Sequence, residues 1–149
     1  MPEVEREHTF EIDLEWQGGR LGTGTVRAGG LRTGVSVPAS MGGPGSGSNP
    51  EELLVSAAAT CYAITLAALL ERMRLPLAAD IALRSRLSVE DGPPLRAVRL
   101  VHQPIVRLAP GADLERARRA AMQAEEYCLV SRALRGNVGI RVEPEVQIG

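Results

Sequence analysis

The chain has 149 residues, the size of one domain or of one protomer of an intertwined oligomer. Its 17 basic and 18 acidic residues give a net charge of -1, so the basic surface of a nucleic-acid-binding protein is not expected. Aromatic residues make up only 3% of the chain, so a monomer has few large side chains to bury and an oligomer is expected.

The sequence ahead of residue 38 has the pattern of short strands. Residues 10–16, FEIDLEW, alternate apolar and acidic side chains, which predicts a half-buried strand. Glycine turns separate it from two further strands, expected at residues 24–27 and 35–37. Residues 8–37 should therefore form an antiparallel meander, and the Gly-, Ser- and Pro-rich residues 38–48 a flexible loop.

The longest apolar segment follows this loop. Asn49, Pro50 and Glu52 have the spacing of a capping box, which predicts a helix over residues 49–73. Residues 53–70 carry no charge, so this helix has no obvious solvent face and is expected to be central and buried. The run is also about as long as a membrane span. Its six alanines and the charges close to both ends favour a helix packed inside a soluble core instead.

The segment after this helix predicts a β-hairpin over residues 79–108. Residues 81–89 alternate in polarity, and the Asp-Gly-Pro-Pro sequence at 91–94 makes the turn. The returning strand should be interrupted at Pro104, because proline cannot donate to a sheet ladder.

The C-terminal part predicts a second buried helix over residues 113–128. Its apolar stripe has helical spacing and consists of Leu114, Ala117, Ala121, Ala124 and Cys128. A short extra turn is expected at residues 131–134, and a final strand at residues 139–148. The resulting fold class is α+β, with antiparallel sheets around two buried helices.

The two cysteines allow more than one reading. A free cysteine is commonly buried as a small apolar residue, so Cys61 and Cys128 can be packing residues alone. There is no CxxC motif and His8 and His102 form no ligand cluster, so a metal site is not supported. No signal peptide is apparent, and the expected compartment is the cytoplasm, where a redox-active or free thiol is more plausible than a structural disulfide.

Two segments around the cysteines form a distinctive pair. NPEELL at residues 49–54 runs on to AAATC at 57–61, and EYCLVS at 126–131 is followed by Ala-Leu at 133–134. Together with Gly18-Gly19-Arg20 and the glycine-rich loop, these segments resemble the OsmC/Ohr family of hydroperoxide-reducing proteins. The resemblance extends over essentially the whole chain and implies a single OsmC-like domain over residues 1–149.

The resemblance also implies a chemistry. The chain would be a thiol peroxidase without cofactor or metal, acting on organic hydroperoxides and, as a further candidate, on hydrogen peroxide. Cys61 would be the peroxidatic thiolate and Cys128 the resolving thiol, with Arg20 and Glu51 as the polar pair that activates Cys61. The reductant would be an external dithiol, dihydrolipoamide on a lipoylated protein.

One departure from the family pattern concerns Leu129. The residue after the second cysteine is usually proline in this family, so Leu129 loosens a constraint on the chain near Cys128. The sequence does not decide between the OsmC and Ohr subfamilies.

The spacing along the first helix bears on assembly. Glu51 and Cys61 are ten residues apart, which is about 15 Å of rise and too far for one arginine to contact both. Either the first turns bend, or Arg20 and Glu51 reach the thiol of a partner chain. The second alternative predicts an intertwined homodimer with two interface sites. A non-catalytic small-ligand-binding protein or a redox sensor on the same scaffold remains the competing hypothesis.

Overall fold

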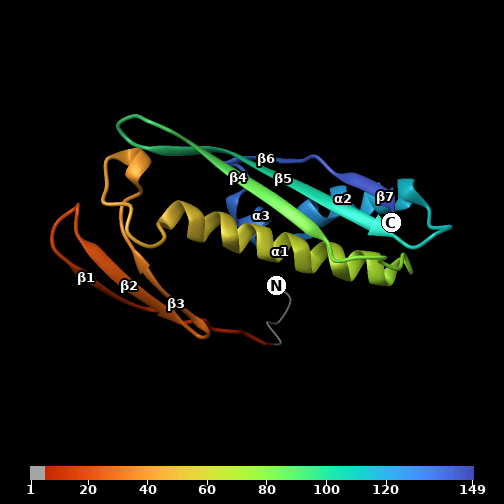
Figure 1. The fold of residues 1–149 in the computed structure, drawn as a ribbon, viewed down its shortest axis with the longest axis horizontal. Helices are drawn as coiled ribbons and strands as arrows, with labels where there is room; N and C mark the ends of the chain where they lie inside the picture. The colour runs from red at the N-terminus through yellow and green to blue at the C-terminus, as the bar shows by residue number, and fades with distance from the viewer. Residues whose placement is uncertain (1–5) are drawn as a thin grey trace. The chain divides into compact units, whose positions relative to one another are not determined.

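The computed structural model describes residues 6–149, which form two compact units (Figure 1). The first unit ends at Leu53 and the second begins at Leu54. Each unit is described by itself below.

The first unit is a three-stranded antiparallel sheet, as the sequence predicts. Its strands lie in the order β1-β2-β3 and span Asp13–Gln17, Thr23–Ala28 and Leu31–Val35. The prediction that one face of residues 10–16 is buried is wrong for the single chain, in which these residues are all exposed. Phe10 is 91% exposed and even Trp16 is 42% exposed, because no other layer of this unit covers these side chains.

The loop expected to be flexible is held to the end of β3. Ser36 is buried; its hydroxyl donates to the carbonyl of Ser46 at 2.9 Å and accepts from the Ser46 amide at 2.8 Å. A short 3-10 helix, η1, covers Ala39–Met41. Gly47 has φ +72°, and a Cβ there would lie 2.2 Å from the carbonyl oxygen of Gly34, so only glycine fits.

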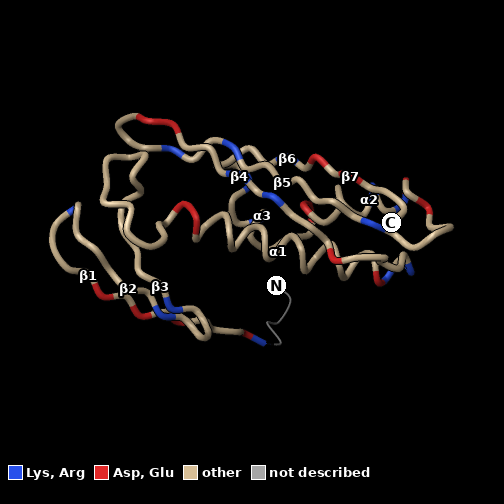
Figure 2. Tube along the Cα trace, viewed as in Figure 1, with Lys and Arg blue, Asp and Glu red and all other residues tan. Residues whose placement is uncertain are grey.

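Helix α1 spans Pro50–Arg72 and begins at the predicted cap. The side-chain oxygen of Asn49 accepts a hydrogen bond from the Glu52 main-chain amide at 2.8 Å. The Glu52 carboxylate in turn accepts one from the Asn49 side-chain NH₂ group, also at 2.8 Å. Figure 2 shows charged residues near both ends of α1 and none along its middle.

The prediction that α1 is buried all round is wrong for the single chain. One stripe is buried, consisting of Ala58, Tyr62, Leu66, Leu69 and Leu70. The opposite face is exposed, and Ile64 on it is 66% exposed. By length and composition α1 could cross a membrane, because an 18-residue window within it has a mean hydropathy of 2.1. In the single chain 28% of this window is buried. Its buried stripe instead contributes to the core of the second unit, as in a helix of a soluble fold.

The sheet of the second unit is mixed rather than wholly antiparallel. Strands β4 and β5 form the predicted hairpin and span Ala82–Glu90 and Arg96–Leu108. The final strand is divided into β6, Gly139–Val142, and β7, Glu145–Ile148. Both pair with β5 in parallel, one after the other along its length.

Pro104 does not interrupt β5, contrary to the sequence prediction. Strand β6 pairs with β5 up to His102, and β7 pairs with it from Ile105 onward. The carbonyl of His102 accepts a hydrogen bond from the Glu143 amide. Because successive residues of a strand direct their N–H and C=O groups to opposite sides, the backbone groups of the even-numbered residues of β5 face β6 and β7. The N–H that Pro104 lacks is therefore missing where the ladder changes partner, and its absence costs little.

Two helices follow, α2 over Leu114–Tyr127 and α3 over Leu129–Leu134. The Asp113 carboxylate caps α2 by accepting from the amides of Glu115 and Arg116. Four members of the predicted stripe, Ala117, Ala121, Ala124 and Cys128, are fully buried, whereas Leu114 at its start is half-buried. Side chains from α1, α2, β5, β6 and β7 share one core cluster. Cys128 lies at the junction of α2 and α3, next to the buried stripe of α1.

Candidate functional site

The second unit brings the two cysteines together. Cys61 lies in the middle of α1 and packs against the core cluster that contains Cys128, at the α2–α3 junction. Each thiol affects the pKa of the other. Both are free thiols; Cys128 is buried and Cys61 is half-buried. Residues 6–149 contain no cluster of three or more His, Cys, Asp or Glu side chains arranged to hold a metal ion.

The main chain in the first turn of α3 influences the pKa of both thiols. The first helical hydrogen bond of α3 runs from the Arg132 amide to the Cys128 carbonyl at 3.0 Å. The amides of the three preceding residues therefore have no acceptor inside the helix. The main chain of Val130 and of Leu129 lowers the pKa of Cys61, and that of Ser131 lowers the pKa of Cys128.

These contacts separate the pKa values of the two thiols. Burial raises the pKa of Cys61, but hydrogen bonds from Val130, Cys128, Leu129 and Thr65 outweigh this cost and leave it below its ordinary value. Burial also raises the pKa of Cys128, and its position as a donor beside Cys61 keeps it above the ordinary value. The first proton lost from the pair therefore leaves the negative charge on Cys61.

A column of three polar side chains, Tyr62, His102 and Ser85, lies in the core next to α1. The ring of Tyr62 stacks on His102 with 4.6 Å between centroids, and His102 Nδ1 lies 2.6 Å from the hydroxyl of Ser85. Burial raises the pKa of Tyr62, so its hydroxyl keeps its proton and donates to the carbonyl of Ala121 on α2 at 2.9 Å. The hydrogen bond and the stacking of Tyr62 tie α1 to α2 and to β5.

Sequence reasoning missed this column. From the sequence, His102 is weighed only as a metal ligand, and Ser85 is given no role. The useful signal was their pairing, because Ser85 and His102 lie opposite each other in the β4–β5 hairpin. A polar pair at facing inward positions of a hairpin indicates a buried hydrogen bond.

We expect His102 to make the protein less stable below about pH 6.5. Burial lowers the pKa of His102, so the unfolded chain takes up a proton in a pH range where the folded protein does not. The free energy of unfolding should then fall with pH by up to about 1.4 kcal/mol per unit between these two pKa values. The negative charge of nearby Glu125 raises the pKa of folded His102 and so narrows the pH range over which stability falls.

Urea unfolding at a series of pH values measures this effect. His102→Gln should be less stable overall but lose the extra slope below pH 6.5, while His8→Gln, at an exposed position, should keep it. Equal slopes for the native chain and His102→Gln would contradict the prediction.

The other two predicted site residues lie in the first unit and do not pair there. The guanidinium of Arg20, in the turn after β1, donates to the carbonyl of Met41 at 3.1 Å. Glu51 lies in the first turn of α1, and its Oε2 atom is buried without a hydrogen-bond partner. Within residues 6–149 no ion pair joins Arg20 to Glu51.

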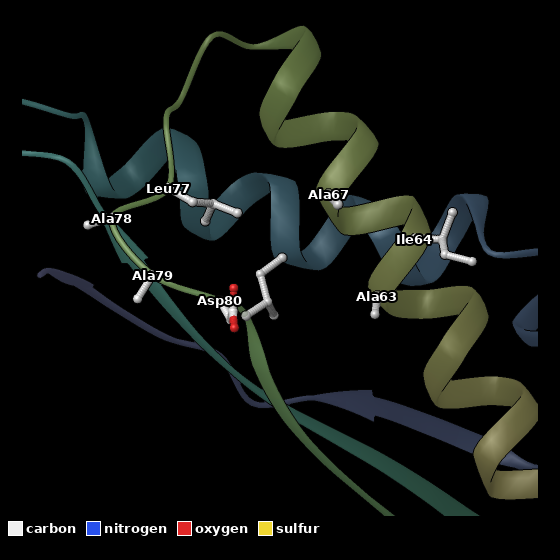
Figure 3. A pocket seen from close by; sticks show the side chains of 8 residues that line it. Ala63, Ile64, Ala67, Leu77, Ala78, Ala79 and Asp80 are labelled. Carbon is white, nitrogen blue, oxygen red and sulfur yellow. The ribbon is translucent and has the colours of Figure 1, made fainter.

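A surface pocket lies along the exposed face of α1 (Figure 3). It has a volume of about 540 Å³ and lies between Ala63, Ile64 and Ala67 of α1 and residues 77–81, the segment that leads into β4. Its lining is apolar except for Asp80, and it includes neither cysteine.

Comparisons with known proteins agree with this fold. The family model described as OsmC-like protein matches residues 43–143, which contain both cysteines. The uncharacterized protein YmaD of Bacillus subtilis is 39% identical over 148 residues, covering 96% of this chain and 97% of that protein.

Solved structures share the fold at lower identity. An organic hydroperoxide resistance protein OsmC from Legionella pneumophila has a TM-score of 0.75 at 23% identity, over 93% of this chain and 99% of the other. The organic hydroperoxide resistance protein OhrB of Bacillus subtilis has a TM-score of 0.68 at 23% identity, over 91% and 98%.

Proposed function

Because this chain belongs to the OsmC-like protein family, we propose that it is a thiol-dependent peroxidase that reduces organic hydroperoxides to alcohols. The observation that carries the proposal is the meeting of the two free thiols Cys61 and Cys128 in one core cluster, with the pKa of Cys61 lowered and that of Cys128 raised. A low-pKa thiolate that also has some access to solvent is the nucleophile that such a reaction needs. Relatives named for organic hydroperoxide resistance share the fold.

The first step is attack by the Cys61 thiolate on the outer peroxide oxygen. An S–O bond forms, the O–O bond breaks, and the leaving alkoxide takes up a proton to become the alcohol. Cys61 is oxidised to a sulfenic acid and the peroxide is reduced by two electrons. Hydrogen peroxide would follow the same course, with water as the product.

The second step joins the two sulfurs. The Cys128 sulfur attacks the sulfur of the Cys61 sulfenic acid, and the hydroxide that leaves takes the Cys128 proton and departs as water. An external dithiol, for which dihydrolipoamide on a lipoylated protein is our candidate, then reduces the disulfide by two-electron exchange. A cytoplasmic location suits this cycle, because cytosolic thiols are kept reduced.

We further propose that the active protein is an intertwined homodimer in which Arg20 and Glu51 act on the partner's Cys61. The apolar face of β1, the exposed face of α1 and the pocket beside Ile64 are uncovered apolar surfaces that a second copy would bury. A guanidinium near Cys61 would favour the thiolate and polarise the peroxide. Glu51 would orient that guanidinium, which would provide a partner for its buried carboxylate oxygen.

The test is to treat the reduced protein with one equivalent of cumene hydroperoxide. We expect rapid loss of both free thiols, loss of two hydrogen atoms in the intact mass, and formation of one equivalent of cumyl alcohol. Reduction with dihydrolipoamide should restore both thiols. If both thiols survive excess peroxide, the cysteines are packing residues, and the pocket beside α1 would make a ligand-binding protein the better assignment.

A further inference from the structure

An ion pair closes the bend in the chain that carries Cys128. Arg135 follows α3, and its Nη2 atom donates to the carboxylate of Glu125 in α2 at 2.9 Å and to the main-chain carbonyl of the same residue at 3.2 Å. We infer that this Glu125–Arg135 clamp positions Cys128 for disulfide formation with Cys61. The inference rests on the proposed function, because it takes the disulfide as a step of the cycle.

The bend at Cys128 joins two helices through one extended residue. Helix α2 ends at Tyr127 and α3 begins at Leu129, while Cys128 between them has φ -66° and ψ 124°. Hydrogen bonds between successive turns hold each helix, but the angle between two helices depends on contacts that join one to the other. The clamp is such a contact, because Glu125 and Arg135 lie ten residues apart on opposite sides of Cys128 in the sequence.

The guanidinium of Arg135 provides a partner for two groups at the end of α2. Glu125 lies in the last turn of α2, where main-chain carbonyls have no donor within the helix, and Arg135 supplies one. The side chain of Glu125 is only 17% exposed, so solvent screens this pair less than it screens two exposed side chains. The clamp therefore ties the end of α2 to the residue after α3 and limits the positions that Cys128 can take.

A second contact connects the bend to the helix that carries Cys61. The hydroxyl of Tyr62, the next residue in α1, donates to the carbonyl of Ala121 in α2 at 2.9 Å. Ala121 lies about one turn before Glu125. Tyr62 thus holds α2 against α1, and the clamp holds the bend that follows α2. A thiol that is already held in place loses less conformational entropy when it forms a bond, so the clamp should favour the disulfide.

The test is the equilibrium of the protein with reduced and oxidised glutathione, measured by alkylation with iodoacetamide and intact mass. The Cys61–Cys128 bond forms, the S–S bond of oxidised glutathione breaks, and the two thiol protons pass to two molecules of reduced glutathione. Arg135→Gln removes the guanidinium that donates both clamp hydrogen bonds. We expect its equilibrium constant for disulfide formation to be about tenfold lower than that of the native chain, which is about 30 mV for two electrons.

Arg118→Gln is the matched control. Arg118 has nearly the same side-chain exposure as Arg135, 45% against 48%, but its ion pair with Glu115 lies within α2 and does not span the bend. Its equilibrium constant should equal that of the native chain. Equal constants for Arg135→Gln and Arg118→Gln would overturn the inference, whatever the two changes do to the free energy of unfolding measured in urea.

Glu125→Gln tests the clamp from its other side. It should lower the same equilibrium constant, and combining it with Arg135→Gln should lower the constant no further than Arg135→Gln alone, because both residues serve one contact. Additive effects would overturn the inference. If Arg135→Gln folds poorly by circular dichroism, Glu125→Gln compared with Glu115→Gln decides the outcome.

Glutathione takes the place of peroxide, so this test separates the clamp from the proposed function. A tenfold shift together with no peroxide consumption by the native chain would support the clamp and reject the peroxidase. An unchanged constant together with rapid peroxide consumption would reject the clamp alone. If the native chain forms no disulfide with oxidised glutathione, both the clamp and the second step of the proposed cycle are rejected.

Discussion

Replacing Cys61 with serine is expected to abolish reaction with organic hydroperoxides. A serine hydroxyl does not ionise near neutral pH, so the four hydrogen bonds that lower the pKa of Cys61 have no thiolate to stabilise. The initial rate of peroxide consumption should fall by at least about 10³-fold, as is usual when a nucleophile is removed. Stopped-flow measurement with cumene hydroperoxide would determine this rate.

Cys128→Ser is the matched variant, because it removes the second sulfur and leaves the first in place. One turnover should proceed and leave Cys61 as a sulfenic acid, detected as a gain of one oxygen atom in the intact mass and by reaction with dimedone. No disulfide should form. If Cys128→Ser lost its first-step reactivity and Cys61→Ser kept it, the assignment of the two roles would be reversed.

The pH dependence of the native first step should follow the Cys61 thiolate. The rate rises with pH until Cys61 is ionised and then levels off, and the pKa of Cys61 lies below that of an ordinary thiol. The plateau should therefore be reached at a lower pH than for a free cysteine in solution.

Replacing Arg20 with methionine is expected to lower the peroxidase rate by about 100-fold, the usual cost of removing one preorganised donor from a developing charge. Arg32→Met is the matched control, since Arg32 is an exposed arginine on the neighbouring β3. It should retain nearly all activity.

Mixed dimers test whether Arg20 acts on the partner chain. Arg20→Met and Cys61→Ser would be unfolded together, refolded and assayed. If Arg20 acts across the interface, a mixed dimer contains one intact site, and random pairing should restore about a quarter of the native activity. No restoration, together with a fully active monomer by analytical ultracentrifugation, would contradict the intertwined homodimer.

Local sequence was sufficient to predict most elements and the family. The Asn49–Glu52 box and the alanine stripe of α2 were predicted correctly, because capping and helical spacing are decided within a few residues. The family resemblance based on the two cysteine segments is confirmed by the match over residues 43–143. The class of fold followed from the order of these elements.

Burial was less predictable, because it depends on what lies opposite a surface. The apolar faces of β1 and α1 have the pattern of core elements, yet the single chain leaves them exposed. The parallel pairing of β6 and β7, and the tolerance of Pro104 between them, likewise depend on strands distant in sequence. Periodicity identifies an apolar face but not its partner.

The sequence alone thus determined which two sulfurs carry the candidate chemistry, since Cys61 and Cys128 are the only cysteines. Only the tertiary structure decided how they differ, because α1 and the first turn of α3 meet through packing between distant segments. Contacts between separate helices leave no local pattern, so the difference between the two thiols could be found only in the folded chain.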